Sequence, residues 1–81
     1  MQINVLLFAA TRDAAGSDTL QLEVADDARA GDVLDAIARQ LPALAALIPS
    51  CRLAVDCCYV SADAPISAHC EIALIPPVSG G

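Results

Sequence analysis

The last residues of the sequence carry its clearest chemical possibility, because the chain ends in Gly80 and Gly81. Glycine has no side chain, so a narrow channel on another protein could close on this backbone while the terminal carboxylate reaches the bottom. A carboxylate is a poor acyl donor, but adenylation by ATP would give it a good leaving group. Attack by a sulfur donor would then leave a thiocarboxylate at Gly81. Such an ending would suit a carrier that delivers one sulfur atom, but spacing alone does not establish sulfur transfer.

Two prolines precede this ending and predict how it is presented. Proline cannot donate a ladder hydrogen bond and favours an extended polyproline conformation. Six extended residues span at most about 20 Å, which is enough to enter a deep slot. We therefore expect a folded domain over residues 1–75 and an extended tail over residues 76–81, whose inserted residues are Pro76, Pro77, Val78, Ser79 and Gly80. The competing interpretation is a frayed terminus, where glycine and proline are common.

The other reactive side chains do not form a catalytic set. The sequence has one histidine, His69, with no Cys-His pair at a plausible spacing and no glycine-rich phosphate loop. We expect His69 to lie in a turn and the cysteines to be reduced thiols at core or surface positions. No Cys-x-x-Cys pair is present among Cys51, Cys57, Cys58 and Cys70, so a zinc site formed by Cys51, Cys57, Cys70 and His69 is disfavoured and no metal is expected. Any acid or base for the transfer should lie on a partner.

Composition limits the partners. Ten acidic and four basic residues give a formal net charge of −6. Too few cations are present to replace counterions on a nucleic acid, and the acidic surface favours proteins with basic docking faces. The apolar stretch over residues 41–49 is too short for a membrane helix, which needs about 20 residues. The N-terminus lacks a basic region typical of signal peptides, so a cytoplasmic location is expected.

Hydrophobic periodicity predicts the elements that must hold the tail. Residues 2–8 alternate as a strand with Leu6 and Phe8 on its outer face, where two bulky apolar residues suggest a docking surface. Residues 9–18 are interpreted as a loop, and residues 19–24 as a second strand that completes a hairpin. Helical spacing begins near Asp32 and ends at Leu41 because Pro42 clashes with a continuing helix. Residues 43–48 could add one more helical turn.

The remaining residues predict the rest of the sheet. Residues 52–60 form a strand, a turn at Asp56-Cys57 and a short return strand. Residues 63–65 form a loop, Ile66 enters the core, and residues 71–75 form the last strand with Ile72 and Leu74 inward. The predicted fold is α+β, with a mixed sheet of four to five strands packed on one main helix.

The ending Ile-Pro-Pro-Val-Ser-Gly-Gly, Ile75 to Gly81, resembles the C-terminal signature of the MoaD family, the small subunits of molybdopterin synthase. Other segments are similar to that family along essentially the whole chain. They are Leu7-Phe8-Ala9, Arg12 to Gly16, Gly31 to Leu34, Ala54-Val55-Asp56 and Glu71-Ile72-Ala73.

This resemblance implies a ubiquitin-like β-grasp fold and a sulfur-carrier function. Gly81 would be adenylated by an E1-like enzyme of the MoeB type and thiocarboxylated with sulfur from a persulfide sulfurtransferase. The acyl-AMP and the thiocarboxylate would be transient, with no permanently bound cofactor. The tail would enter a large subunit of the MoaE type, in a heterotetramer that converts cyclic pyranopterin monophosphate to molybdopterin. By position, Phe8, Tyr59 and Ile75 match the family's docking residues, to which we add Leu6.

Two loops depart from the family pattern. Asp56-Cys57 stands where the family usually has Asn-Gly, and cysteine is poorly suited to a positive φ. His69-Cys70 stands where the family has Gly-Asp. The geometry of both loops is therefore left open.

Three other functions remain open. A thiamine-type carrier of the ThiS kind would use the same chemistry, although its tail lacks the paired prolines. A ubiquitin-like modifier would join Gly81 to lysines by isopeptide bonds. A binding module would carry an inert tail.

Overall fold

The sheet has five strands in a computed structural model that describes residues 1–76. Their order across the sheet is β2-β1-β5-β3-β4. The central strands β1 and β5 are parallel, and the other neighbours are antiparallel, so the sheet is mixed. The strands are β1 (Gln2–Leu7), β2 (Thr19–Glu23), β3 (Arg52–Val55), β4 (Cys58–Tyr59) and β5 (Ile72–Ile75).

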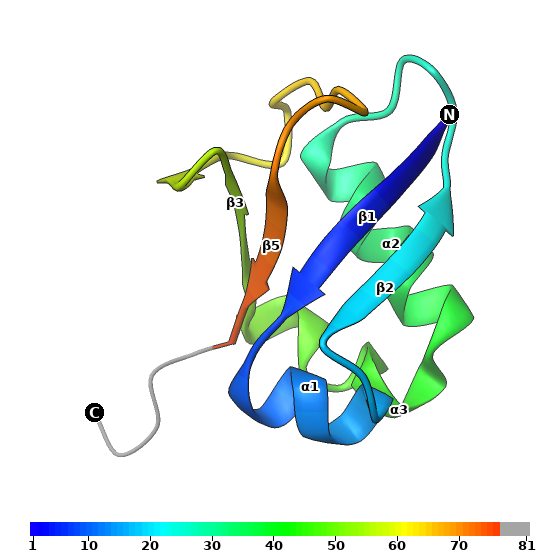
Figure 1. The fold of residues 1–81 in the computed structure, drawn as a ribbon, viewed down its shortest axis with the longest axis vertical. Helices are drawn as coiled ribbons and strands as arrows, with labels where there is room; N and C mark the ends of the chain where they lie inside the picture. Colours follow the sequence, from blue (N-terminus) through cyan, green and yellow to red (C-terminus); the bar gives the residue numbers. More distant parts are fainter. Residues whose placement is uncertain (77–81) are drawn as a thin grey trace.

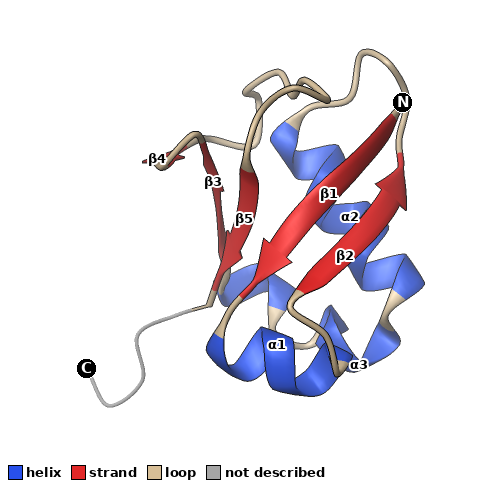
Figure 2. Ribbon diagram, in the orientation of Figure 1, coloured by secondary structure: helices blue, strands red, loops and turns tan. Residues whose placement is uncertain are grey.

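Helix α2 (Ala30–Gln40) crosses one face of this sheet, as Figures 1 and 2 show. It starts where the backbone N–H of Arg29 donates to the Asp32 carboxylate at 2.9 Å, which satisfies one unpaired group of the first turn. Val33 and Ile37 are fully buried on its inner side. The helix ends before Pro42, as predicted, and Pro42 opens the short helix α3 (Pro42–Ala45). A 3₁₀ turn, η1 (Ile48–Ser50), follows.

The core lies between α2 and the inner face of the sheet. Alternate residues of β1, β2, β3 and β5 point into it, whereas both residues of β4 are exposed, which confirms the predicted α+β class and the predicted inward positions. Ile66 is 6 % exposed and closes the core, as predicted. The buried strand residues are Ile3, Val5, Leu7, Leu22, Leu53, Ile72 and Leu74. Within the described residues, no helix is both long and apolar enough to cross a membrane.

The prediction of a loop over residues 9–18 was wrong, because helix α1 (Ala9–Ala15) occupies most of it. Phe8 precedes this helix instead of ending β1. Gly16 ends the helix in the left-handed conformation, at φ 73°, and its N–H donates to the Arg12 carbonyl at 2.9 Å. Glycine adopts this conformation without a steric penalty. In Figure 1, α1 and α3 lie together at one end of the sheet.

Candidate functional site

The face of the sheet opposite α2 is open and divides into two halves. Side chains that are paired across antiparallel strands point to the same face, so the register assigns each residue to a half. The half near β2 is polar and carries Gln2, Asn4, Thr19, Gln21 and Glu23. The half around β5 is apolar. It pairs Ala73 with both Leu6 and Ala54, and Ala54 with Tyr59.

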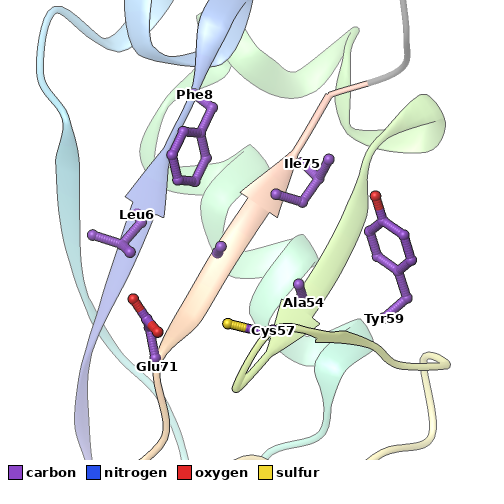
Figure 3. Close-up of a pocket in the computed structure, with 8 residues that line it drawn as sticks. Leu6, Phe8, Ala54, Cys57, Tyr59, Glu71 and Ile75 are labelled. Carbon is purple, nitrogen blue, oxygen red and sulfur yellow. The ribbon is translucent and has the colours of Figure 1, made fainter.

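A groove of about 330 Å³ lies over the apolar half and gathers all four predicted docking residues, Leu6, Phe8, Tyr59 and Ile75. Figure 3 shows these side chains standing on the open side of the sheet. Phe8 is 45 % exposed and Tyr59 is 63 % exposed, the large apolar side chains that are most exposed within residues 1–76. The structure therefore places the four together, and their docking role stays a prediction. We call this groove the apolar face.

Four further residues line the apolar face and were not among the predicted site residues: Ala54, Cys57, Glu71 and Ala73. The alternation of inward and outward residues in the last predicted strand indicated two of them, Glu71 and Ala73. Since Ile72 and Leu74 point inward, Glu71 and Ala73 have to point outward beside Ile75. The strand order, which brings Leu6 next to Ala73, could not be read from local periodicity.

Phe8 is held on the apolar face by the start of α1. The hydroxyl of Thr11 donates to the Phe8 carbonyl at 2.6 Å and accepts from the Phe8 N–H at 3.2 Å. Thr11 is completely buried, so these bonds also satisfy the only polar side chain that is buried within residues 1–76. The sequence pattern of a hydroxyl residue in the first helical turn, an alanine-rich segment and Gly16 could have revealed this helix.

The turn between β3 and β4 sets the edge of the apolar face. Asp56 and Cys57 both have positive φ, at 51° and 70°. Two consecutive positive values are what a two-residue hairpin turn of the primed type requires. The predicted turn at this position is confirmed, and cysteine occupies a conformation that favours glycine.

All four cysteines are free thiols. Cys51 is buried, and its thiol donates to the Leu47 carbonyl at 3.1 Å. Burial raises the pKa of the Cys51 thiol. Cys57 and Cys58 are exposed, and His69 lies in an exposed turn, as predicted. Residues 1–76 hold no group of three or more metal-ligating side chains placed to bind an ion.

The predicted tail begins beside the apolar face. Strand β5 ends at Ile75, and Pro76 follows as a half-buried residue outside the strand. The strand therefore ends at the residue where its end was predicted. The predicted inserted residues Pro77, Val78, Ser79 and Gly80, and the predicted reactive residue Gly81, lie outside the described residues.

Known proteins resemble the chain over its whole length. The molybdopterin synthase sulfur carrier subunit of Chlamydomonas reinhardtii is 37% identical over 83 residues, which cover all of both chains. SAMP1 of Haloferax volcanii, a small archaeal modifier protein, has a TM-score of 0.85 and 31% identity with full coverage of both chains.

Another solved structure is a complex of subunits 1 and 2 of molybdopterin-converting factor from Helicobacter pylori. The matching chain has a TM-score of 0.70 and 22% identity, with full coverage of both chains, and shares the fold. The helix across a mixed five-stranded sheet is thus the ubiquitin-like β-grasp fold, as the resemblance implied. The ThiS family matches residues 5–81, and the chain therefore belongs to the ThiS family, which includes the MoaD-type carriers.

Proposed function

We propose that this protein is the sulfur carrier subunit of a molybdopterin synthase. The observation that carries the proposal is that β5 ends on the apolar face at Ile75, and that the sequence Pro-Pro-Val-Ser-Gly-Gly begins at the next residue. A partner that covers this face would be placed to receive the residues that follow Ile75. The relative from Chlamydomonas reinhardtii, which is named as such a carrier subunit, supports the proposal.

The chemistry proposed for Gly81 has two stages. An E1-like enzyme of the MoeB type transfers AMP from ATP to the terminal carboxylate, with release of pyrophosphate. The terminal sulfur of a persulfide sulfurtransferase then displaces AMP to give an acyl disulfide, and a thiol cleaves its S–S bond, which releases the thiocarboxylate and leaves a disulfide on the sulfurtransferase. This sulfur is transferred to cyclic pyranopterin monophosphate in the active site of a large subunit of the MoaE type. We propose the same heterotetramer as in the family, in the cytoplasm.

The folded domain contributes docking and presentation to this reaction. Leu6, Phe8, Tyr59 and Ile75 would bury against the large subunit and against the activating enzyme in turn. Burial of large aromatic side chains at the centre of an interface commonly supplies much of the binding energy. The groups that polarise or protonate the substrate would belong to the partner.

Deletion of Gly80 and Gly81 tests the proposal. The variant should fold normally, since β5 ends at Ile75, and should still bind the native large subunit through the apolar face. It should give no thiocarboxylate with the activating enzyme, ATP and a sulfur source, and no molybdopterin. A variant with one residue added after Gly81 should behave in the same way. Continued molybdopterin formation by either variant would rule the proposal out.

A ubiquitin-like protein modifier is the second candidate, favoured by the 31% identity to SAMP1 of Haloferax volcanii. Both functions begin with activation of Gly81, but their products differ in mass. Thiocarboxylate formation replaces one oxygen by sulfur, whereas conjugation adds the mass of a whole target protein. Intact-mass spectrometry of protein purified from its native host distinguishes the two.

A further inference from the structure

Two side chains of opposite charge lie at the two ends of the apolar face. Glu71 precedes β5 and lines the groove between β1 and the β3–β4 turn, where Figure 3 shows its carboxylate above the sheet. Arg52 opens β3 at the other end, where it pairs in register with Ile75. Its guanidinium lies over the Tyr59 ring, 5.7 Å from the centroid.

These charges are too far apart to satisfy one another. The strand partner of Arg52 is Ile75, which lies four positions after Glu71 in the sequence, a distance of about 13 Å along an extended strand. This exceeds the screening length of about 8 Å at physiological ionic strength. Within residues 1–76, the salt bridges join the N-terminus to Asp26 and Arg12 to Asp18, and neither involves these two groups.

Glu71 is also held firmly at the rim of the apolar face. Its carbonyl accepts from the Asp56 N–H at 2.8 Å, and its own N–H donates to the Asp56 carboxylate at 2.9 Å. Both backbone groups of Glu71 are therefore fixed to the β3–β4 turn, while its side chain remains exposed. Asp56 is thus a positioning residue for the Glu71 carboxylate.

We propose that the partner covering the apolar face carries a basic side chain opposite Glu71 and an acidic side chain opposite Arg52, close to the entrance for the tail. This inference rests on the proposed docking function, and it specifies where the partner carries a positive and a negative charge. A charge covered by a partner without a counterion loses its hydration, which is unfavourable. Complementary charges at the rim instead fix orientation and reject partners with the reversed pattern.

The occupant we favour is a different protein with a basic docking region. A second copy of the chain could match Arg52 with Glu71 in an antiparallel arrangement. Each copy has a net charge of −6, however, so two copies would repel one another. The net negative charge of the chain instead favours a partner whose docking surface is apolar at its centre and basic around it.

Charge reversal tests the proposal with the native large subunit of molybdopterin synthase as the probe. Glu71→Lys and Arg52→Glu should each weaken binding by roughly 10- to 100-fold, because like charges would then face each other. Two matched controls make the same charge changes elsewhere: Glu23→Lys on the polar half of the open face, and Arg39→Glu at the exposed end of α2. Each control should change affinity by about twofold or less. The differences should shrink at high salt.

The outcomes separate this inference from the proposed function. If Phe8→Ala weakens binding and Glu71→Lys does not, docking on the apolar face stands and the charge proposal fails. If Phe8→Ala also has no effect, the docking function itself fails. Equal losses for Glu71→Lys and Glu23→Lys would mean that only net charge matters, which overturns the proposal. Sedimentation that shows a dimer of the wild-type chain, lost in Glu71→Lys, would also overturn it in favour of the second copy.

Discussion

The two faces of β5 differ in what covers them. Ile72 and Leu74 are 1 % and 0 % exposed, because α2 and the inner face of the sheet enclose them. Ala73 and Ile75, on the other side of the same strand, are only partly buried and have no helix above them. Both faces are apolar, yet only one is covered within the described structure.

Because of this difference, the inner residues of β5 should contribute mainly to folding stability and its outer residues mainly to binding. Apolar burial is the main favourable contribution to folding, so the inner residues determine whether the domain forms. The outer residues gain comparable burial only when another molecule covers them. Substitutions on the two faces should therefore affect different measurements.

Truncation of the inner face should have the largest effect. Leu74→Ala should lower the free energy of unfolding by about 2–5 kcal/mol, since it leaves a cavity in the core. Ile75→Ala, one residue away on the apolar face, should cost about 1 kcal/mol or less. Urea unfolding followed by circular dichroism measures both values. Equal losses would show that the outer face contributes to stability as much as the inner face does.

Truncation of the outer face should reverse this ranking when binding is measured. Phe8→Ala should weaken the complex with the native large subunit by about 2–4 kcal/mol if Phe8 is a hot spot of that interface. Its free energy of unfolding should change little, because the Phe8 side chain is 45 % exposed. Titration calorimetry gives the affinity, and an unchanged value would remove Phe8 from the interface.

Thr11 links the core to the apolar face, because its buried hydroxyl holds the backbone of Phe8, whose ring is exposed. Thr11→Val should destabilise the domain by about 1–2 kcal/mol, because it removes the hydroxyl bonds to Phe8 while keeping the volume. It should also weaken docking, because the backbone around Phe8 is no longer fixed. Thr11→Ser retains the hydroxyl and should retain most of the affinity. Equal affinities for the Val and Ser variants would contradict this role of the hydroxyl.

Much of the fold was predictable because its determinants are local. Period-two alternation located β1, β2 and β5, and helical spacing before Pro42 located α2. Helix α1 was missed because Ala9–Ala15 contributes only one completely buried residue, Thr11, so it has no apolar stripe. Its signals are the Thr11 hydroxyl and Gly16, which act through the backbone.

The candidate site was only partly predictable from the sequence. Alternation placed Leu6 outward, and family resemblance identified Phe8, Tyr59 and Ile75. Their convergence depends on the parallel pairing of β1 with β5, which joins residues far apart in the sequence. The hydrogen bonds between Asp56 and Glu71 are likewise tertiary. Local periodicity contains no information about either contact.

Substitution in the β3–β4 turn should have a smaller effect, in the stabilising direction. Cys57 has a φ of 70°, so Cys57→Gly should remove backbone strain and raise stability by about 0.5–1 kcal/mol after the entropy of the unfolded chain is counted. The neighbouring change Cys58→Gly should destabilise, because Cys58 lies in β4 and has no such strain. Thermal unfolding measures both. Two changes of the same sign would contradict the proposed strain at residue 57.

The smallest effect concerns the buried thiol of Cys51 and the exposed thiols of Cys57 and Cys58. Burial raises the pKa of Cys51, so the folded state disfavours its thiolate. Above the ordinary thiol pKa, this thiolate forms more readily in the unfolded chain, so stability should fall as pH rises there. Cys51→Ala should reduce that pH dependence. Maleimide should accordingly label the exposed Cys57 and Cys58 well before Cys51, and equal labelling rates would show that the core does not protect this thiol.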